Sequence, residues 1–109
     1  MTLDIQHALA STFSAHLNST FRLSHGSATM DLVLVEILDG STPRQVNFSL
    51  LLRGPLEPPL PQQIYPLEHD QLGQFDLLIV PIKRDANGLY YEAVFNRVIR
   101  TTASANERP

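Results

Sequence analysis

From Thr20 onward, apolar and polar side chains alternate every second residue, and this period constrains the fold more than any other feature. In the segment TFRLSH (20–25), Phe21 and Leu23 share one face and polar residues share the other. Successive side chains of a β-strand point to opposite faces, so the alternation predicts strands that bury one side. A longer example is QVNFSLLLR (45–53), whose apolar face is Val46, Phe48, Leu50 and Leu52.

Six such segments follow one another without a helical pattern between them. They span residues 20–25, 28–38, 45–53, 63–69, 74–82 and 89–99. The connections are short, and the Asn-Gly pair in RDANG (84–88) is a strong hairpin signal, so we expect antiparallel pairing. Two segments are apolar on both faces and need cover from other elements. We therefore predict a mainly β fold, a small antiparallel six-stranded barrel or two-layer sandwich with a short N-terminal helix.

The only helical pattern lies before the first strand. Apolar residues recur every four positions there and predict a helix over residues 3–17; they are Ile5, Leu9, Phe13 and Leu17. Ser11 is a candidate N-cap for a shorter helix that restarts inside this range. We expect residues 1–100 to form one domain, with the helix at one end or edge of the sheet. The polar residues 101–109 predict a disordered tail.

Four prolines separate two of the most apolar segments: Pro55, Pro58, Pro59 and Pro61. Proline fixes φ and lowers the entropy of the unfolded chain, so these residues fit a stiff corner between strands. The alternative is a polyproline recognition loop over residues 55–61, which contains two P-x-x-P spacings. We favour the corner, because the segment lies between buried strands. Pro66 has no N–H to donate, which confines the next strand to an edge or a bulge.

Composition argues against several classes of protein. One lysine, seven arginines and a net charge of −3 are unlike a protein that binds a nucleic-acid backbone. The chain has no cysteine, which excludes disulfides and thiolate zinc sites. The N-terminus does not resemble a signal peptide, and no apolar run approaches the length of a membrane span. We expect a soluble cytoplasmic protein with neither a nucleic-acid nor a membrane partner.

Residue types that carry chemistry are present, but not in catalytic spacing. No G-x-S-x-G elbow and no glycine-rich phosphate loop occurs. Asp31 and Glu36 lie in one strand at odd spacing, so we expect them on opposite faces. No metal-ligand spacing joins the four histidines, which are His7, His16, His25 and His69. The sequence thus predicts no catalytic residue, no metal site and no cofactor.

Two arginines are candidate binding residues. Arg97 continues the apolar face of the last strand, and Arg53 ends the third strand. An unpaired buried charge is costly, so each guanidinium should find a carboxylate or backbone carbonyls. One interpretation is a structural ion pair at the end of the barrel, and the other is a site for an anionic group in a mostly apolar pocket. The residues of that candidate site are Arg97, Asn96, Arg53 and Tyr65.

Several strings between Thr12 and Arg97 occur together in a recognisable combination. They are Phe13–His16–Leu17–Phe21, FSLLLRGP, LPQQIYPLEHDQLGQFDLLIVPI and the closing YEAVFNR. In combination they resemble a family of short bacterial proteins known only as a domain of unknown function, which ends in a Phe-Asn-Arg motif. Members often have glycine where this chain has Asn18 and Gln63, so the turns there are expected to differ. The resemblance implies no activity; it implies an accessory or chaperone role beside phage-tail-collar-like fibre proteins.

Three hypotheses on function follow. The first is a non-enzymatic β-domain that acts in protein association, as a homo-oligomer or with a protein partner, because an edge strand can accept a partner's strand. The second is a small-ligand-binding barrel that holds an anionic group. The third is an uncharacterised hydrolase or metal site. We favour the first, because no catalytic constellation is visible in the sequence.

Overall fold

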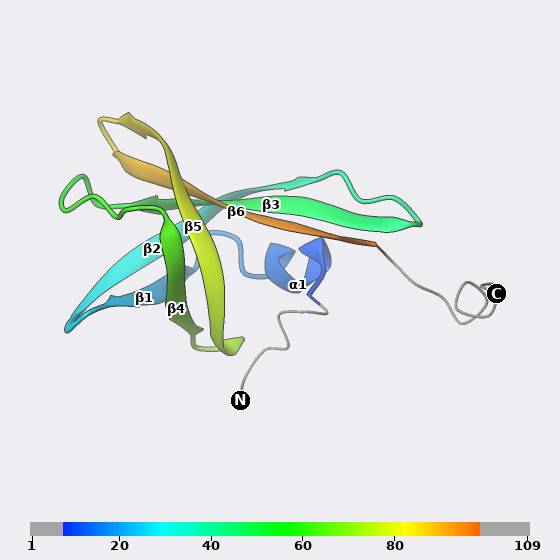
Figure 1. Cartoon of the computed structure of the whole chain (residues 1–109), viewed down its shortest axis with the longest axis horizontal. Helices are drawn as coiled ribbons and strands as arrows, with labels where there is room; N and C mark the ends of the chain where they lie inside the picture. Colours follow the sequence, from blue (N-terminus) through cyan, green and yellow to red (C-terminus); the bar gives the residue numbers. More distant parts are fainter. Residues whose placement is uncertain (1–7, 99–109) are drawn as a thin grey trace.

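One short helix and six strands make up the fold, described by a computed structural model for residues 8–98 of the 109. Helix α1 spans Ala10–Ser14. The strands are β1 (Thr20–His25), β2 (Ala28–Asp39), β3 (Gln45–Gly54), β4 (Gln63–His69), β5 (Gly73–Asp85) and β6 (Gly88–Val98) (Figure 1). Each strand overlaps its predicted segment, so the mainly β, six-stranded prediction is confirmed. The described part of the chain contains no helix long and apolar enough to cross a membrane. The predicted tail, 101–109, lies outside the described residues.

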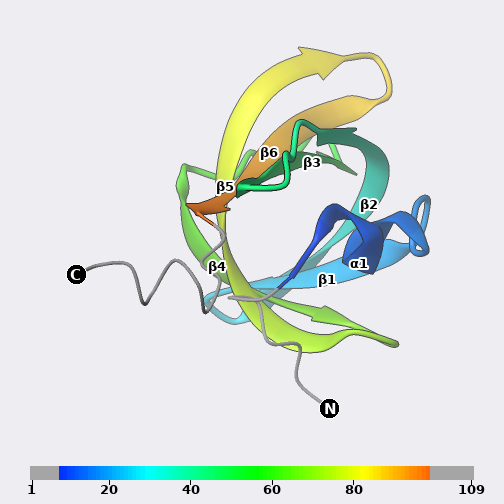
Figure 2. The ribbon, with the colours of Figure 1, turned by 90° about the vertical axis from the view of Figure 1, so that its right-hand side faces the viewer.

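The strands form one antiparallel sheet that closes into a barrel-like ring. Around the ring the order is β1–β2–β3–β6–β5–β4, and β4 pairs with β1 to complete it. Seen end-on, the strands surround the core and α1 lies at one mouth of the ring (Figure 2). Of the two predicted architectures, the ring is observed rather than the two-layer sandwich.

Two seams of the ring are only partly closed. β1 and β4 share two residue pairs, Arg22↔Glu68 and Leu23↔Leu67. The ladder stops next to Pro66, because proline has no N–H to donate. β4 therefore behaves as an edge strand along its first half, as predicted. On the other side, β5 and β6 pair only as far as Val80↔Glu92, and the strands then diverge (Figure 1).

The divergence leaves a three-stranded arm that extends from the ring (Figure 1). We define the arm as residues 37–39 of β2, 45–50 of β3 and 93–98 of β6, which pair in that order. Phe48 and Phe95 lie opposite each other on its inner face, and their rings stack with centroids 4.5 Å apart. The arm presents its outer face away from the core.

A bulge in β2 changes which side chains face outward. The register with β3 shifts between Leu34 and Glu36, so Val35 is the extra residue. Asp31 and Glu36 are both exposed, one on each side of the bulge. The prediction that these carboxylates lie on opposite faces is therefore wrong, because the bulge moves every later residue to the other face.

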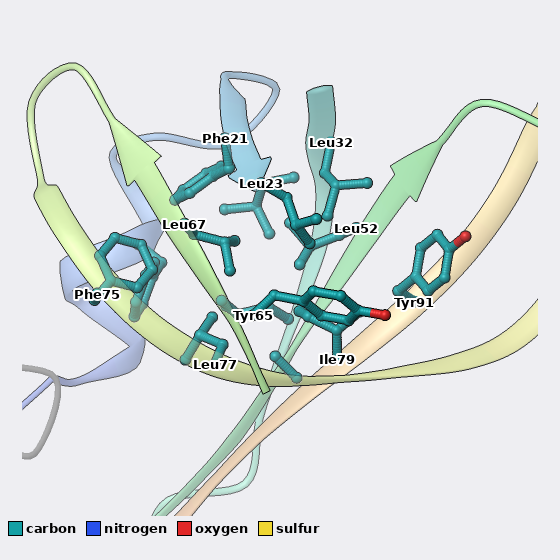
Figure 3. Close-up of a cluster of buried hydrophobic side chains, with 14 of the residues drawn as sticks. Phe21, Leu23, Leu32, Leu52, Tyr65, Leu67, Phe75, Leu77, Ile79 and Tyr91 are labelled. Atoms are coloured by element: carbon teal, nitrogen blue, oxygen red, sulfur yellow. The ribbon is translucent and has the colours of Figure 1, made fainter. Parts of the chain in front are cut away.

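Inward side chains fill the ring. In β3, the predicted alternation is confirmed, with Val46, Phe48, Leu50 and Leu52 buried. They belong to one cluster with leucines and Ile79 of the other strands, and Figure 3 shows Leu52 among these side chains. Burial of one such side chain stabilises the fold by about 1.5–3 kcal/mol. The core is thus a packed apolar interior that joins all six strands.

Phe13 closes one mouth of the ring. Its side chain is fully buried, and α1 carries it into the core. The ring centroid of Phe13 lies between 5.4 and 6.4 Å from four other aromatic rings, which are Phe21, Phe48, Phe75 and Phe95. These rings come from β1, β3, β5 and β6. One side chain therefore packs against four strands, including the two that diverge.

The helix is shorter than the predicted range of 3–17. Ala8 and Leu9 are not helical, and residues 3–7 of the predicted range lie outside the described residues. Leu9 is the N-cap residue rather than Ser11, and its N–H donates to Thr12 Oγ1 at 3.0 Å. Of the predicted apolar stripe, Phe13 alone is buried within the described part, since Leu9 and Leu17 are exposed and Ile5 is not described.

Asn18 ends this segment and turns the chain into β1. Its φ is 70°, in the left-handed region that glycine and asparagine tolerate best. The Asn18 N–H donates to the Leu34 carbonyl at 2.7 Å, which fixes the turn against β2. A glycine at this position, as in the family that the chain resembles, suits the same φ. The expected difference in this turn is therefore small.

Two tyrosines hold the proline segment over the other mouth of the ring. Tyr91 Oη accepts the N–H of Leu60 at 3.1 Å, and Tyr65 Oη donates to the Pro61 carbonyl at 2.6 Å. Leu60 is buried, while the four prolines are exposed. Both tyrosines belong to the cluster of buried side chains in the ring (Figure 3). The segment is a corner, as predicted, and the recognition loop stays a prediction.

Phe13→Ala is expected to lower the free energy of unfolding by about 3–5 kcal/mol, because it removes a fully buried aromatic ring and leaves a cavity. Urea unfolding followed by far-ultraviolet circular dichroism measures the change. Leu17→Ala is the control, since Leu17 is 44 % exposed and surface substitutions cost about 0.5 kcal/mol or less. Equal losses in the two variants would contradict the role given to Phe13.

Tyr91→Phe is expected to cost more stability than Tyr65→Phe. The first leaves the buried Leu60 N–H without an acceptor, at about 1–3 kcal/mol. The second frees the carbonyl of exposed Pro61, which water can reach, so we expect about 0.5–1.5 kcal/mol. Parallel urea titrations compare the two variants, and the reverse order would show that Tyr91 does not hold the segment.

Candidate functional site

Arg97 lies on the inward face of β6, as predicted. Its neighbours on that face, Ala93 and Phe95, are buried, and Val46 lies opposite in β3. The guanidinium finds a backbone carbonyl, because Nη1 donates to the Ala8 oxygen at 2.7 Å. Arg97 thus fastens the segment before α1 to the inner face of the arm.

Asn96 and Arg53 face outward and do not join Arg97. Asn96 is exposed, and its Oδ1 accepts a hydrogen bond from Gln45 Nε2. Arg53 lies opposite Tyr90, seven residues along β6 from Arg97, which is roughly 20 Å at the rise of a strand. Arg53 faces outward because the inward residues of β3 occupy the even positions.

Tyr65 belongs to the mouth that holds the proline segment. Its side chain is buried, and burial raises the pKa of its phenol, with a smaller contribution from nearby Tyr91. Its hydroxyl is already bonded to Pro61. The structure therefore does not gather Arg97, Asn96, Arg53 and Tyr65 into one anion pocket; they lie on two faces and at two ends of the sheet.

A surface hollow that sequence reasoning missed lies between the end of α1 and the β4–β5 turn. Its volume is about 580 Å³. Polar side chains from segments far apart in the chain line it, among them His16, Ser19, His69 and Asp70. Nothing in the sequence spacing signals this group, since Ser19 and His69 are 50 residues apart. Closure of the ring between β1 and β4 brings the two segments together.

Ser19 and His69 form a hydrogen-bonded pair in this hollow. Ser19 Oγ lies 2.9 Å from His69 Nε2. His69 Nδ1 accepts the backbone N–H groups of Gln71 and Leu72, at 3.0 and 3.2 Å. A ring nitrogen that accepts carries no proton, so the proton of neutral His69 sits on Nε2 and is donated to Ser19.

The direction of these hydrogen bonds opposes nucleophilic catalysis. Ser19 Oγ donates its own proton to the His16 carbonyl, while it accepts from His69. A histidine that acts as general base must instead accept the serine proton on one ring nitrogen. Its other ring nitrogen must donate its N–H to a third group, which is the acceptor. Here the far nitrogen is itself the acceptor. The arrangement ties the end of α1 to the β4–β5 turn.

The neutral state of His69 is favoured by its surroundings. Burial lowers the pKa of His69, the nearby His16 ring lowers it further, and Asp70 acts in the opposite direction. The two imidazole rings meet edge to face, with centroids 4.7 Å apart. Within residues 8–98, no group of three or more histidine, aspartate or glutamate side chains is arranged to hold a metal ion.

A second candidate site is the outer face of the arm. Its outward side chains carry no charge: they are Leu38, Gln45, Asn47, Ser49, Val94, Asn96 and Val98. Leu38, Ser49 and Val94 form one row across the three strands. The aliphatic members are well exposed, with Leu38 at 58 %, Val94 at 60 % and Val98 at 66 %. This face is suited to contact with another macromolecule rather than to chemistry.

Stability is expected to fall as the pH drops below 6.5. The unfolded chain protonates His69 near its ordinary pKa, whereas the folded chain holds that pKa lower, so acid favours the unfolded state in between. Thermal unfolding between pH 7.5 and 5.5 measures this loss. His69→Asn keeps an acceptor for the turn and should lose much of the slope, whereas His25→Asn, at an exposed position, should keep it. Equal slopes in all three proteins would contradict this role of His69.

Comparison with known proteins gives a family but no activity. The family model described as Domain of unknown function (DUF6916) matches residues 9–95. No curated protein and no solved structure matches the chain. The match begins at the residue that caps α1 and extends into β6, so it includes part or all of every element of the fold. The chain therefore belongs to the family of the Domain of unknown function (DUF6916).

Proposed function

We propose that this domain acts in protein association, as an accessory part of a larger assembly and without an enzymatic activity of its own. The observation that carries this proposal is the charge-free outer face of the arm. The cores of protein interfaces are depleted of charge and more apolar than the rest of the surface. The chain as a whole is 17 % charged, whereas all seven outward positions of this face are uncharged.

The interior offers less support for the small-ligand alternative. Phe13 occupies one mouth of the ring, and the buried Leu60 occupies the other. Arg97 and Tyr65, which were candidates to bind an anionic group, already bond to backbone carbonyls. The hydrolase alternative is weakened by the direction of the Ser19–His69 bond. These features support association through a surface better than they support a small-ligand site or a hydrolase.

The nature of the assembly is a narrower part of the proposal. The family resemblance favours service to a phage-tail-collar-like fibre protein in a bacterial cytoplasm. The absence of cysteine suits a reducing compartment. The net charge of −3 gives no reason to include a nucleic acid or an anionic membrane among the partners.

Leu38→Lys is expected to weaken binding to a protein partner at least tenfold, because it places a charge in the uncharged face. The binding partners to test are the proteins encoded beside the gene, and surface plasmon resonance against each of them measures affinity. Ile64→Lys is the matched control, since Ile64 is 64 % exposed but lies on β4, away from the arm. Unchanged binding in Leu38→Lys, or an equal loss in Ile64→Lys, would remove the arm from the proposal.

A further inference from the structure

The edge of β6 that faces away from β3 in the arm is the feature from which we argue for a specific partner. β6 pairs with β3 along its whole length, but with β5 only up to Glu92. In the part of the chain that the structure describes, no strand lies along the other edge of residues 93–98. The backbone N–H and C=O groups of such an edge can pair with a further strand.

The other partly open edges of the ring carry features that hinder strand addition. The edge of β2 has a bulge at Val35 and the charged Glu36 just before the arm, and the charged Asp39 within it. The open half of β4 contains Pro66, and the open half of β5 presents Asp76 outward. Charges, proline and bulges are the usual protections of a sheet edge. The edge of β6 has none of them on its outward side.

The one charged residue of this stretch does not protect the edge. Arg97 faces the core, and its Nη1 is bonded to the Ala8 carbonyl. The outward residues of β6 are Val94, Asn96 and Val98, all exposed. This pattern reads the same in both directions about Asn96. In an antiparallel pair of identical strands with a two-fold axis at Asn96, each outward valine of one copy therefore meets an outward valine of the other.

We propose that the β6 edge pairs antiparallel with the β6 edge of a second copy of this chain, about a two-fold axis at Asn96. This inference rests on the proposed function and names the partner. Asn96 then lies opposite Asn96 of the partner subunit, and Val94 lies opposite Val98 of the partner subunit. Valine meets valine and amide meets amide, with no charge opposed on the outer face.

Other registers fit less well. A slip of one residue places outward Asn96 opposite inward Phe95 of the partner subunit, so the two faces no longer match. A slip of two residues places Val94 opposite an asparagine. In the register proposed, Asn96 Oδ1 is occupied by Gln45 Nε2, and its amide N–H groups remain to reach across the axis. The two arms then form one continuous six-stranded sheet. The uncharged surface on its outer face is twice that of a single arm.

Disulfide cross-linking tests the axis directly, because the chain contains no cysteine. Residues directly opposite in an antiparallel pair have Cα atoms about 4.5–5.5 Å apart, within the range of a disulfide. Asn96→Cys alone is expected to give a disulfide-linked dimer under mild oxidation. Val94→Cys alone and Val98→Cys alone are expected to stay monomeric on a non-reducing gel, because their copies lie four residues out of register, roughly 13 Å. A mixture of these two variants should give the mixed dimer.

Ile64→Cys is the control, at an exposed position on β4. Cross-linking of Ile64→Cys or Val94→Cys as fast as Asn96→Cys would overturn the proposal. So would a folded Asn96→Cys that does not cross-link, together with a wild-type chain that sediments as a monomer at high concentration. Partner binding that is lost in Leu38→Lys but accompanies a monomeric chain would leave the proposed function standing and remove the β6 pairing alone.

Discussion

The packing of Phe13 against four aromatic rings is the interaction on which the rest of the structure depends. β5 and β6 separate after Val80↔Glu92, so their ladder cannot hold the ring closed on that side. Phe13 bridges this opening by contact with Phe75 on β5 and Phe95 on β6. Arg97 adds a polar fastening through Ala8. The arm is continuous with the ring through β2, β3 and β6, and Phe13 adds packing across the side where β5 and β6 separate.

The Ser19–His69 pair shows that proximity of catalytic residue types does not make a catalytic site. The distance of 2.9 Å between Ser19 Oγ and His69 Nε2 is by itself compatible with a serine nucleophile and its base. The backbone N–H groups of Gln71 and Leu72 decide otherwise, because they require an unprotonated Nδ1 and so place the proton on Nε2. The serine in turn donates to a carbonyl. Every donor and acceptor of the pair is used to hold the chain in place.

Much of the fold follows from the two-residue period, and little of the sites does. The period predicts β3 and β6, because buried side chains recur at every second position from Val46 to Leu52 and from Tyr91 to Phe95. It fails in β2, where one bulged residue at Val35 reverses the faces, but it places Arg53 correctly on the outward face. The predicted helix is too long, because a four-residue spacing of apolar side chains does not show which of them become buried. Within residues 8–98, Phe13 is the one member of the stripe that is buried. The Ser19–His69 contact depends on ring closure, which sequence spacing does not encode.

The clasp formed by Tyr65 and Tyr91 has a spectroscopic consequence. The chain has no tryptophan and three tyrosines, so phenol rings dominate its near-ultraviolet absorption. Two of the three lie in the core with their hydroxyls bonded to the proline connection. Their absorbance and fluorescence therefore report on that mouth of the ring, while the aromatic cluster around Phe13 remains nearly silent at the same wavelengths. A change in the tyrosine signal with an unchanged far-ultraviolet dichroism would therefore report opening of this end while the sheet remains folded.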